Sequence, residues 1–431
     1  MNLEIKGGKK LKGTVTTNTS KNAAMGLMAA SLLNKGTTLL RQVPKIEEVN
    51  RMIEVLTSLG AKINWIQGNN LKIVPPSKIS LEKLNKKSAI KTRSIIMLLG
   101  PLIHEFKKFK LPQPGGCKLG RRTVRPHLFA LENLGVKIET RSKYYEVTRQ
   151  KLKAEEIVLY ESGDTTTENI IMAAAKIPGK TTIKLASANY QVQDLCRFLS
   201  LLGVKIKGIG TTTLTIIGQC RLHKNIEYHL SEDPIESMFF LAVSATTNSP
   251  LLIKRCPIDF LELELLKLEK MNFKFKIIKK YKAKNRFTNL VDIKTYPSQL
   301  QALEEKIYAR PFPGLNIDNL PFFVPIATQA KGQTLIHDWV YEHRAIYYTE
   351  LSKLGAKIIL ADPYRVYIDG PSKLKAAEII CPSALRPATI ILIAMLSAKG
   401  TSILRNIYSI NRGYENLSER LNNLGAEIKI I

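Results

Sequence analysis

The chain has 431 residues, 45% of them hydrophobic and 23% charged, which is typical of a folded protein with more than one domain. No apolar run approaches the ~18 residues of a membrane span, and residues 1–10 lack the apolar core of an export signal. Five scattered cysteines form no disulfide framework, which favours a reducing cytoplasm, and the net charge of +29 admits either a solvated, lysine-rich surface or an anionic partner.

The first predicted elements surround two polar residues near the N-terminus. Ser20 is a good N-cap for a helix that begins with Lys21 and Asn22, and a helix N-terminus also attracts anions, so a structural and a ligand-binding role are compatible there. Strands are predicted over residues 61–65 and 71–74. The stretch "SIIMLLGPLI" over residues 94–103 has no polar face, which predicts a helix buried on all sides.

One motif recurs about every 70 residues along the whole chain. Each copy reads as a helix end, a glycine and a strand, as in "LTSLGAKI" and "LSKLGAKI", and the copies end at Ile63, Ile138, Ile206, Phe275, Ile358 and Ile428. The glycine fits the left-handed position at which helices stop. Six such units predict an α/β (α+β) fold of two inside-out domains, each of three repeats with internal helices and outer sheets. A solenoid would need shorter units.

Two short polar breaks mark where the chain would cross between these domains. They are "TTNTSKN" at residues 16–22 and "HLSEDPIES" at residues 229–237. We therefore expect one domain over residues 22–231, with the N-terminal strand over residues 1–21 joining residues 232–431 in the other.

The loop "QPGGCKLGRR" over residues 113–122 combines a thiol, glycines and three cations. It is either an ordinary basic loop or a site that needs a thiolate near an anion. Burial of Cys117 is not expected beside Gly115, Gly116 and Lys118, and the neighbouring cations should lower its pKa. The other four cysteines, in apolar or strand contexts, are expected to be inert: Cys196, Cys220, Cys256 and Cys381.

Four motifs together carry a resemblance: "SKNAAM" at residues 20–25, "LPQPGGCKLGRR" at 111–122, "FPGLNID" at 312–318 and "INRGYENL" at 410–417. From end to end the chain resembles the enolpyruvyl transferases, in particular those that act on UDP-N-acetylglucosamine in peptidoglycan synthesis. The resemblance implies phosphoenolpyruvate and UDP-N-acetylglucosamine as substrates, release of phosphate, no cofactor, and closure of two domains around the substrates.

The same resemblance implies a role for individual residues. Cys117 would be the proton donor and Asp318 would contact the attacking hydroxyl. Phosphoenolpyruvate carries a phosphate and a carboxylate, which suit several cations; Lys21, Arg122, Arg386 and Arg412 match these, with Lys21 and Arg412 counted as catalytic. Further substrate contacts are implied for Asn22, Arg93, Thr123, Val124, Val340, Tyr341 and Arg344. His127 is open between a structural and a functional role.

The resemblance weakens at the positions expected near the nucleotide. The altered residues are Met97, Arg125, Glu161, Gly163, Thr165, Pro234 and Ala384. They leave open a rebuilt site for the same acceptor, a different acceptor, or a non-catalytic paralogue that uses the positive charge. Retention of Lys21, Cys117, Arg122, Asp318 and Arg412 argues against the last. No metal-ligand spacing and no nucleic-acid or membrane motif is present, and a monomer is expected.

Overall fold

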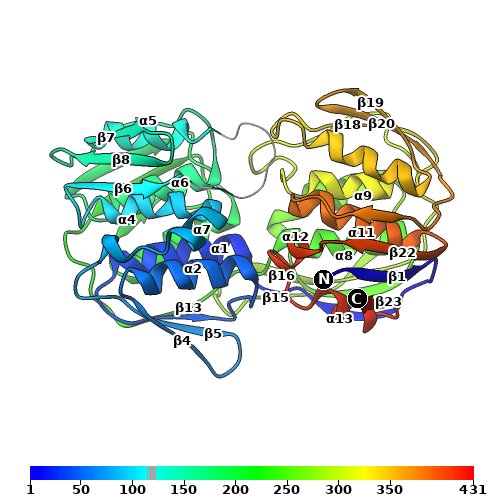
Figure 1. The fold of residues 1–431 in the computed structure, drawn as a ribbon, viewed down its shortest axis with the longest axis horizontal. Coiled ribbons are helices and arrows are strands. Elements are labelled where there is room, and N and C mark those ends of the chain that lie inside the picture. Colours follow the sequence, from blue (N-terminus) through cyan, green and yellow to red (C-terminus); the bar gives the residue numbers. More distant parts are fainter. Residues whose placement is uncertain (114, 116–122) are drawn as a thin grey trace. The chain divides into compact units, whose positions relative to one another are not determined.

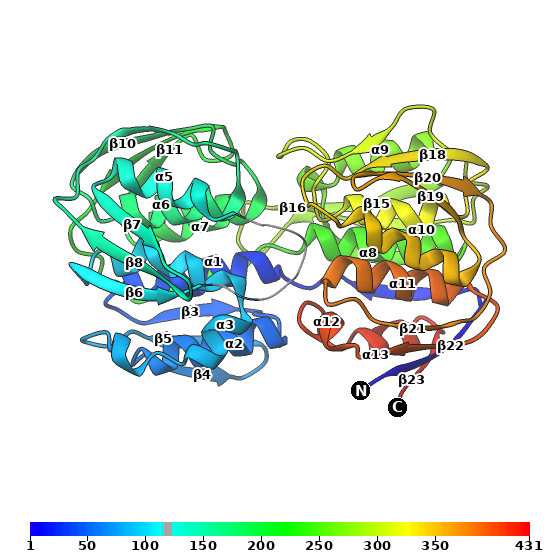
Figure 2. The same ribbon diagram turned by 45° about the horizontal axis from the view of Figure 1, so that its top comes forward.

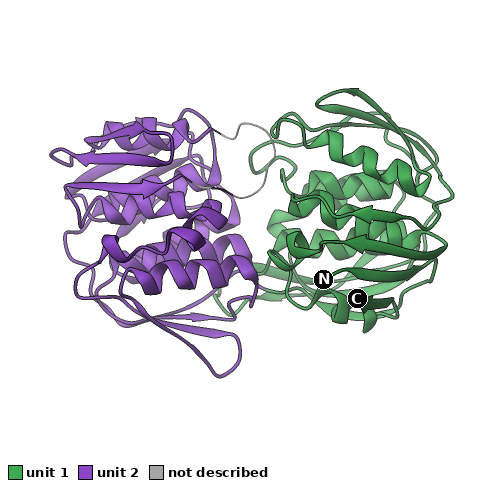
Figure 3. Cartoon of the chain, viewed as in Figure 1, with its two compact units in different colours: residues 1–18, 117–122, 232–431 green, residues 19–116, 123–231 purple. Residues whose placement is uncertain are grey.

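The computed structural model describes residues 1–113, 115 and 123–431, so Cys117 and Arg122 lie outside the described residues. The chain divides into two compact units (Figure 3): unit 1 contains Met1–Asn18 and Glu232–Ile431, and unit 2 contains Thr19–Gly116 and Thr123–Ser231. The chain thus passes between units after Asn18 and after Ser231. Both crossings fall inside the predicted polar breaks, the first a few residues before the expected boundary at Lys21.

The elements follow one another in a repeated order (Figure 1). Unit 2 contains α1 (Lys21–Ala30), η1 (Ser31–Leu33), β3 (Thr38–Arg41), α2 (Glu47–Ser58), β4 (Lys62–Ile66), β5 (Asn70–Val74), η2 (Leu81–Lys83), α3 (Lys86–Lys91), η3 (Arg93–Leu98), α4 (Leu99–Leu102), β6 (Lys108–Pro112), α5 (Arg125–Asn133), β7 (Val136–Thr140), β8 (Tyr144–Arg149), β9 (Glu156–Val158), α6 (Asp164–Ala174), β10 (Gly179–Lys184), α7 (Tyr190–Leu201), β11 (Lys205–Lys207), β12 (Thr213–Gly218) and β13 (Ile226–His229).

Unit 1 contains β1 (Leu3–Gly7), β2 (Gly13–Thr16), α8 (Pro234–Thr246), β14 (Leu251–Pro257), η4 (Ile258–Phe260), α9 (Glu262–Lys270), β15 (Phe275–Lys282), β16 (Asn289–Thr295), β17 (Ile307–Tyr308), η5 (Leu320–Phe322), α10 (Phe323–Ala327), β18 (Gly332–His337), η6 (Ala345–Leu354), β19 (Lys357–Asp362), β20 (Arg365–Gly370), β21 (Glu378–Ile380), α11 (Leu385–Ser397), β22 (Gly400–Arg405), α12 (Tyr408–Asn411), α13 (Leu417–Asn422) and β23 (Glu427–Ile430). In both units the recurring order is inner helix, strand, outer helix, strand, strand.

The described strands form six small sheets, three in each unit. Their orders are β13-β3-β5-β4, β6-β8-β7 and β11-β12-β10-β9 in unit 2, and β15-β16-β14-β2, β17-β18-β20-β19 and β21-β22-β1-β23 in unit 1. Each four-stranded sheet has one parallel pair at an edge and is otherwise antiparallel. The N-terminal strand β1 is central in its sheet, where Ile5 pairs with Ser402 and with Ile428.

Helices fill the inside of each unit and the sheets lie outside them. In unit 1, α8, α10 and α11 lie side by side within the sheets (Figure 2), and every residue of α8 is buried. In unit 2, α1, α4 and α6 occupy the equivalent positions. The apolar core of unit 2 runs from Ala24 to Leu230 and that of unit 1 contains only residues of unit 1, so each unit has its own core. The predicted fold class is confirmed.

The buried helix predicted over residues 94–103 is divided into η3 and α4. The side-chain amide of Asn169, from α6, lies at the break: its Nδ2 donates to the carbonyl of Ile96 at 2.8 Å and its Oδ1 accepts from the amide of Gly100 at 2.8 Å. Asn169 therefore replaces the hydrogen bond that a continuous helix would form between Gly100 and Ile96. Burial is as predicted, since Ile96 is 1% exposed.

A residue with a left-handed backbone follows each outer helix within three positions of its end. In five repeats it is a glycine with φ between 89° and 105°, and in the degenerate fourth repeat it is Asn272 with φ 62°. Asparagine is the residue besides glycine that most readily adopts this conformation. The five glycines are Gly60, Gly135, Gly203, Gly355 and Gly425.

Gly135→Ala should destabilise unit 2 more than Gly203→Ala. Both positions have positive φ and each substitution incurs about 1–2 kcal/mol of backbone strain. A Cβ at Gly135 would also lie 2.5 Å from the carbonyl oxygen of Lys151, whereas at Gly203 it would meet only side-chain atoms at 3.4 Å or more. Denaturation followed by the fluorescence of Trp65 measures the free energy of unfolding of both variants. Equal decreases in the two variants would contradict the steric argument.

No helix in the described part of the chain is both long enough and apolar enough to span a membrane.

Candidate active site

Asp318 in unit 1 lies between two arginines that come from distant parts of the sequence. Its Oδ2 is 3.4 Å from Nη2 of Arg386, and its Oδ1 is 3.9 Å from Nη1 of Arg344. The side chain of Asn316 accepts a hydrogen bond from the Asp318 amide at 2.8 Å, which fixes the local turn. The Asp318 side chain is 29% exposed while both arginines are buried. The carboxylate therefore faces solvent with two cations behind it.

Arg344 is fully buried and held by several partners. Its Nε and Nη2 donate to the two oxygens of Asp338 at 2.5 and 2.8 Å, and Nη2 also donates to the carbonyl of Ile317 at 2.9 Å. Tyr348 donates to Asp338 at 2.5 Å. Within the described residues Nη1 of Arg344 has no hydrogen bond, and it is the atom that faces Asp318. This geometry places the guanidinium of Arg344 behind the carboxylate of Asp318. The substrate contact expected for Arg344 stays a prediction.

Arg386 is the second residue of α11, and its side chain is 8% exposed. Its Nη1 donates to the hydroxyl of Tyr414 at 2.9 Å. Burial alone would lower the pKa of Arg386, but Tyr414, Asp318 and Asp233 raise it above its ordinary value, so the guanidinium stays charged. Arg412 is the C-cap of α12, half-buried, two residues before Tyr414.

Val340 and Tyr341 lie between β18 and η6, in the segment that leads to Arg344. Both are half-buried, and the guanidinium of Arg344 stacks 4.5 Å from the centre of the Tyr341 ring. The preceding Trp339 is 48% exposed, and its indole nitrogen donates to the carbonyl of Ala309 at 2.8 Å. These contacts fix the segment beside the Asp318 cluster.

In unit 2, Lys21 and Asn22 form the first turn of α1. Ser20 is the N-cap, as predicted, and its Oγ accepts from the amide of Ala23 at 3.2 Å. Nδ2 of Asn22 donates to the hydroxyl of Tyr190 at 3.2 Å. Lys21 and Asn22 are both half-buried. The positive end of the helix and the lysine together make this turn suited to an anion.

Arg93 begins η3 in the same unit and lies near His127. Nδ1 of His127 accepts from Nδ2 of Asn169 at 3.1 Å, so Nε2 carries the ring proton and faces Oγ1 of Thr165 at 3.4 Å. Burial lowers the pKa of His127 to about 3, and the charge of Arg93 adds to this shift. The ring is therefore neutral at physiological pH, which supports a structural role for His127.

His127 should make the folded chain sensitive to acid. Its pKa is about 3 when folded and ~6.5 when unfolded, so between these values only the unfolded chain takes up the proton. The stability that it contributes is present above pH ~6.5 and is lost as the pH falls towards 3, by up to about 1.4 kcal/mol per pH unit. His127→Asn keeps an acceptor for Asn169. Its free energy of unfolding, measured by denaturation, should fall less steeply between pH 6 and pH 4 than that of the wild type. An unchanged slope would contradict the prediction.

Of the residues predicted in and after the cysteine loop, the structure describes Thr123 and Val124. Oγ1 of Thr123 accepts from the amide of Arg125 at 3.1 Å, and Thr123 is exposed. Val124 is the buried N-cap residue of α5. Arg125, the first helical residue, is exposed, so its charge is available to a ligand.

Most of the other altered positions lie at or next to helix starts, with Ala384 as the N-cap of α11, whereas Met97 is buried inside η3. Gly163 is the N-cap of α6, with Glu161 exposed just before it and Thr165 exposed just after. Pro234 is the first residue of α8, where a missing N–H costs nothing, and Asp233 caps that helix. The start of α6 is thus an accessible surface with polar groups that differ from the family pattern.

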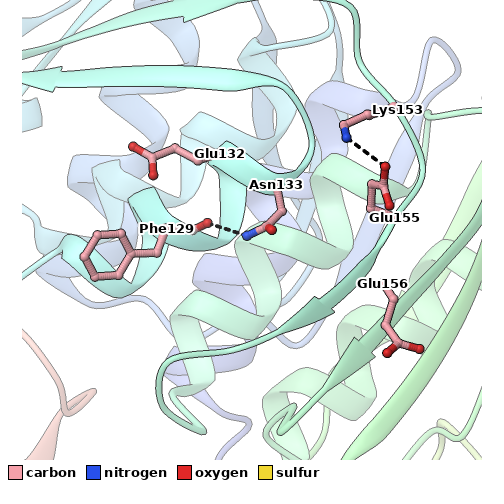
Figure 4. A pocket seen from close by; sticks show the side chains of 6 residues that line it. All are labelled: Phe129, Glu132, Asn133, Lys153, Glu155 and Glu156. Carbon is pink, nitrogen blue, oxygen red and sulfur yellow. Dashed lines mark hydrogen bonds and ion pairs between the residues drawn. The ribbon is translucent and has the colours of Figure 1, made fainter.

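A separate surface hollow of about 560 Å³ in unit 2 is lined by Phe129, Glu132, Asn133, Lys153, Glu155 and Glu156 (Figure 4). Three of these residues are acidic, and the only lysine is paired with Glu155 at 2.8 Å. This environment disfavours an anionic substrate. Among the described residues, no cluster of three or more His, Cys, Asp or Glu side chains is arranged to hold a metal ion.

Sequence reasoning missed the buried residues that orient the predicted ones. They are Asp338, Tyr348 and Tyr414 in unit 1, and Asn169 and Tyr190 in unit 2. A polar residue inside an apolar stretch was the available signal, but it does not identify the partner.

Comparison with known proteins gives matches over nearly the whole chain. Residues 5–421 match the family described as EPSP synthase (3-phosphoshikimate 1-carboxyvinyltransferase). The UDP-N-acetylglucosamine 1-carboxyvinyltransferase of Treponema denticola is 34% identical over 99% of this chain and 98% of its own, and that of Wolinella succinogenes is 35% identical with the same coverage. Carboxyvinyl and enolpyruvyl are two names for one group.

The chain belongs to the enolpyruvyl transferase family. The resemblance carried by the four sequence motifs is thereby confirmed. Solved structures agree on the fold: the enolpyruvyl transferase NikO from Streptomyces tendae has a TM-score of 0.86 at 24% identity, covering 99% of this chain and 98% of its own. The EPSP synthase of Acinetobacter baumannii has a TM-score of 0.77 at 18% identity, with full coverage of both chains. This enolpyruvyl transferase is closer in sequence to the UDP-N-acetylglucosamine enzymes than to either structure.

Proposed function

We propose that this enolpyruvyl transferase moves the enolpyruvyl group of phosphoenolpyruvate to the 3′-hydroxyl of UDP-N-acetylglucosamine and releases phosphate, the first committed step of peptidoglycan synthesis. The observation that carries this proposal is the identity of 33–35% with enzymes named for that activity, over nearly the full length of both chains. The described cysteines are free, which suits a reducing cytoplasm.

The reaction needs a proton donor, a proton acceptor and several cations. The sugar hydroxyl adds to C2 of phosphoenolpyruvate and loses its proton, while C3 gains a proton; then C3 loses a proton and the bond from C2 to the phosphate oxygen breaks. By resemblance, Cys117 donates the proton at C3 and Asp318 receives that of the hydroxyl. The partial exposure of Asp318, with Arg386 and Arg344 behind it, supports this role because the carboxylate is oriented and open on one side.

The remaining roles follow the charges of the substrates. Lys21, Arg122, Arg386 and Arg412 would bind the phosphate and carboxylate of phosphoenolpyruvate. Asn22 and Arg93 would orient the acceptor, with Thr123, Val124, Val340 and Tyr341 as further contacts. Exposed Arg125 is suited to an acceptor diphosphate and would compensate for the altered residues near Gly163.

Phosphate release tests the proposal directly. The purified chain is incubated with phosphoenolpyruvate alone, with added UDP-N-acetylglucosamine, and with added N-acetylglucosamine that lacks the nucleotide. We expect release only with the UDP-sugar, and a product mass equal to the acceptor with one hydrogen replaced by a carboxyvinyl group. Release with another acceptor alone would establish the alternative of a different substrate. No release with any acceptor, together with salt-sensitive DNA binding, would indicate a non-catalytic paralogue.

Cys117 should react with the epoxide antibiotic fosfomycin, as the resemblance implies. The thiolate would open the epoxide, forming a C–S bond while the released oxygen takes a proton. Among the described cysteines, burial raises the pKa of Cys196, Cys256 and Cys381 to about 12, which keeps those thiols protonated and inert. Intact mass should show one adduct, present in Cys220→Ser and absent in Cys117→Ser. An adduct that is still present in Cys117→Ser would contradict this prediction.

A further inference from the structure

Helix α7 of unit 2 carries a tyrosine whose hydroxyl reaches the first turn of α1. Tyr190 is 1% exposed, and its hydroxyl is 3.2 Å from Oγ of Ser20 and 3.2 Å from Nδ2 of Asn22. These partners lie 170 and 168 positions earlier in the sequence. One hydroxyl therefore contacts both the N-cap of α1 and one of the two residues that open the helix.

The Ser20 hydroxyl couples Tyr190 to the helix itself. Oγ of Ser20 donates to Tyr190 and accepts from the amide of Ala23 at 3.2 Å, so the cap and the tyrosine form one chain of hydrogen bonds. Lys21 lies between the two residues that Tyr190 holds. The direction of the Lys21 backbone is therefore set by Ser20 and Asn22.

One turn further along α7, Asp194 is linked to Ser20 through Ser231. Its Oδ1 accepts from the hydroxyls of Tyr228 and Ser231, each at 2.7 Å, and its Oδ2 accepts from the amide of Ser231 at 3.0 Å. The carbonyl of Ser231 then accepts from the amide of Ser20 at 2.8 Å. Residues four apart on a helix share a face, so Tyr190 and Asp194 act on Ser20 together.

The buried polar groups of this arrangement depend on one another for their hydrogen bonds. Asp194 is 2% exposed and Ser231 is 3% exposed, and polar groups removed from water lose free energy unless they are hydrogen-bonded. The next buried positions of α7 are apolar: Leu195, Cys196, Phe198 and Leu199. The polar side chains of this face meet at the start of α1. They also fix Ser20, the second residue after the chain enters unit 2, and Ser231, the last residue before the chain leaves it.

We propose that Tyr190 and Asp194 are positioning residues that hold Lys21 and Asn22 in the orientation that substrate binding requires; this rests on the proposed function. Tyr190 acts through Asn22 and the cap, and Asp194 acts through Ser231. Neither touches the reacting atoms. Without the Tyr190 hydroxyl, the helix still forms but its first turn is free to adopt other orientations, so substrate affinity falls while the fold persists.

The test compares Tyr190→Phe with Tyr281→Phe. Tyr281→Phe likewise removes a hydroxyl that forms a hydrogen bond, in this case with Asp292 at 2.7 Å. Tyr281 belongs to unit 1 and has no proposed role. Tyr190→Phe should raise KM for phosphoenolpyruvate and the acceptor about five- to tenfold, the effect of one lost hydrogen bond, with a smaller change in kcat. Tyr281→Phe should leave both unchanged. A lower melting temperature of Tyr190→Phe with unchanged KM would overturn the proposal, because a purely structural residue behaves in that way.

A double-mutant cycle separates positioning from a general loss of order. In an Asn22→Ala background, Tyr190→Phe should have less effect on KM than in the wild type, because part of its path to the substrate is already removed. If the effects of Asn22→Ala and Tyr190→Phe on KM combine independently, Tyr190 does not act through Asn22. Asp194→Asn should give the same rise in KM; if it fails to fold, Ser231→Ala takes its place.

Failure of this inference can be told apart from failure of the proposed function. If the wild type releases phosphate and Tyr190→Phe has unchanged KM, only the positioning role fails. If the wild type does not turn over, calorimetric titration with phosphoenolpyruvate still compares the two proteins, and weaker binding by Tyr190→Phe would support positioning. A wild type that neither turns over nor binds phosphoenolpyruvate would overturn both.

Discussion

Replacing Asp318 with asparagine should lower kcat by about 10²- to 10⁴-fold, the range expected when a proton acceptor is lost. Asparagine has nearly the same shape and can still accept the hydrogen bond that Arg386 donates to Asp318, but it cannot take the proton of the attacking hydroxyl. KM should change much less than kcat, because the binding cations remain. Steady-state phosphate release measures both constants.

The control for this variant is Asp369→Asn in the same unit. Asp369 lies near the end of β20, where its side chain accepts a hydrogen bond from exposed Gln333 at 2.9 Å, so the change removes a charge from a surface pair of strands. Its kcat should equal that of the wild type. If Asp318→Asn retained most of the wild-type kcat, Asp318 would not be the base, and its arginine partners would be structural.

Replacing Asp338 with asparagine should destabilise unit 1 by about 3–5 kcal/mol, the cost of leaving a buried charge without its partner. Asp338 and Arg344 are both 0% exposed, and each oxygen of Asp338 receives one nitrogen of the guanidinium. Asparagine keeps the volume and removes the charge, so the loss reports electrostatics and not a cavity. Activity should fall as well, because Arg344 would no longer be held against Asp318.

The two tryptophans make this measurable unit by unit. Trp339 lies next to Asp338 in unit 1 and Trp65 lies in unit 2, so denaturation in a Trp65→Phe background follows unit 1 alone. Glu378→Gln is the matched control: it breaks an ion pair with Arg405 in which both side chains are about half exposed, and it should cost less than about 1 kcal/mol. Equal decreases in the free energy of unfolding of Asp338→Asn and Glu378→Gln would show that burial does not strengthen the pair of Asp338 with Arg344.

The interior of each unit explains why such polar clusters can be held firmly. Inner helices such as α8 and α11 are buried almost along their entire length, so they cannot shift without disturbing the surrounding sheets. Arg386 is the second residue of α11 and Lys21 is the first of α1, which places both cations at the ends of buried helices. Rigid helices thus carry the residues that the proposed chemistry uses.

The sequence by itself determined the repeat, the fold class and the motif-bearing residues. A helix that ends in a left-handed residue and is followed by a strand is a local pattern, set by backbone sterics and hydrophobic spacing, and it was readable in all six copies, including the degenerate one at Asn272. The cap at Ser20 and the buried stretch over residues 94–103 were readable for the same reason.

Only the tertiary structure decided which side chains meet. Asp318 and Arg386 are 68 positions apart, and Ser20 and Tyr190 are 170 apart, so no local pattern joins them. The break between η3 and α4 was equally hidden, because it depends on an amide that Asn169 inserts from another helix. The position of Arg344 was hidden in the same way, because only packing shows that its side chain is 0% exposed and lies behind Asp318. Periodicity is written in neighbouring residues, whereas the partners of a polar side chain are chosen by elements that meet only when the whole unit has packed.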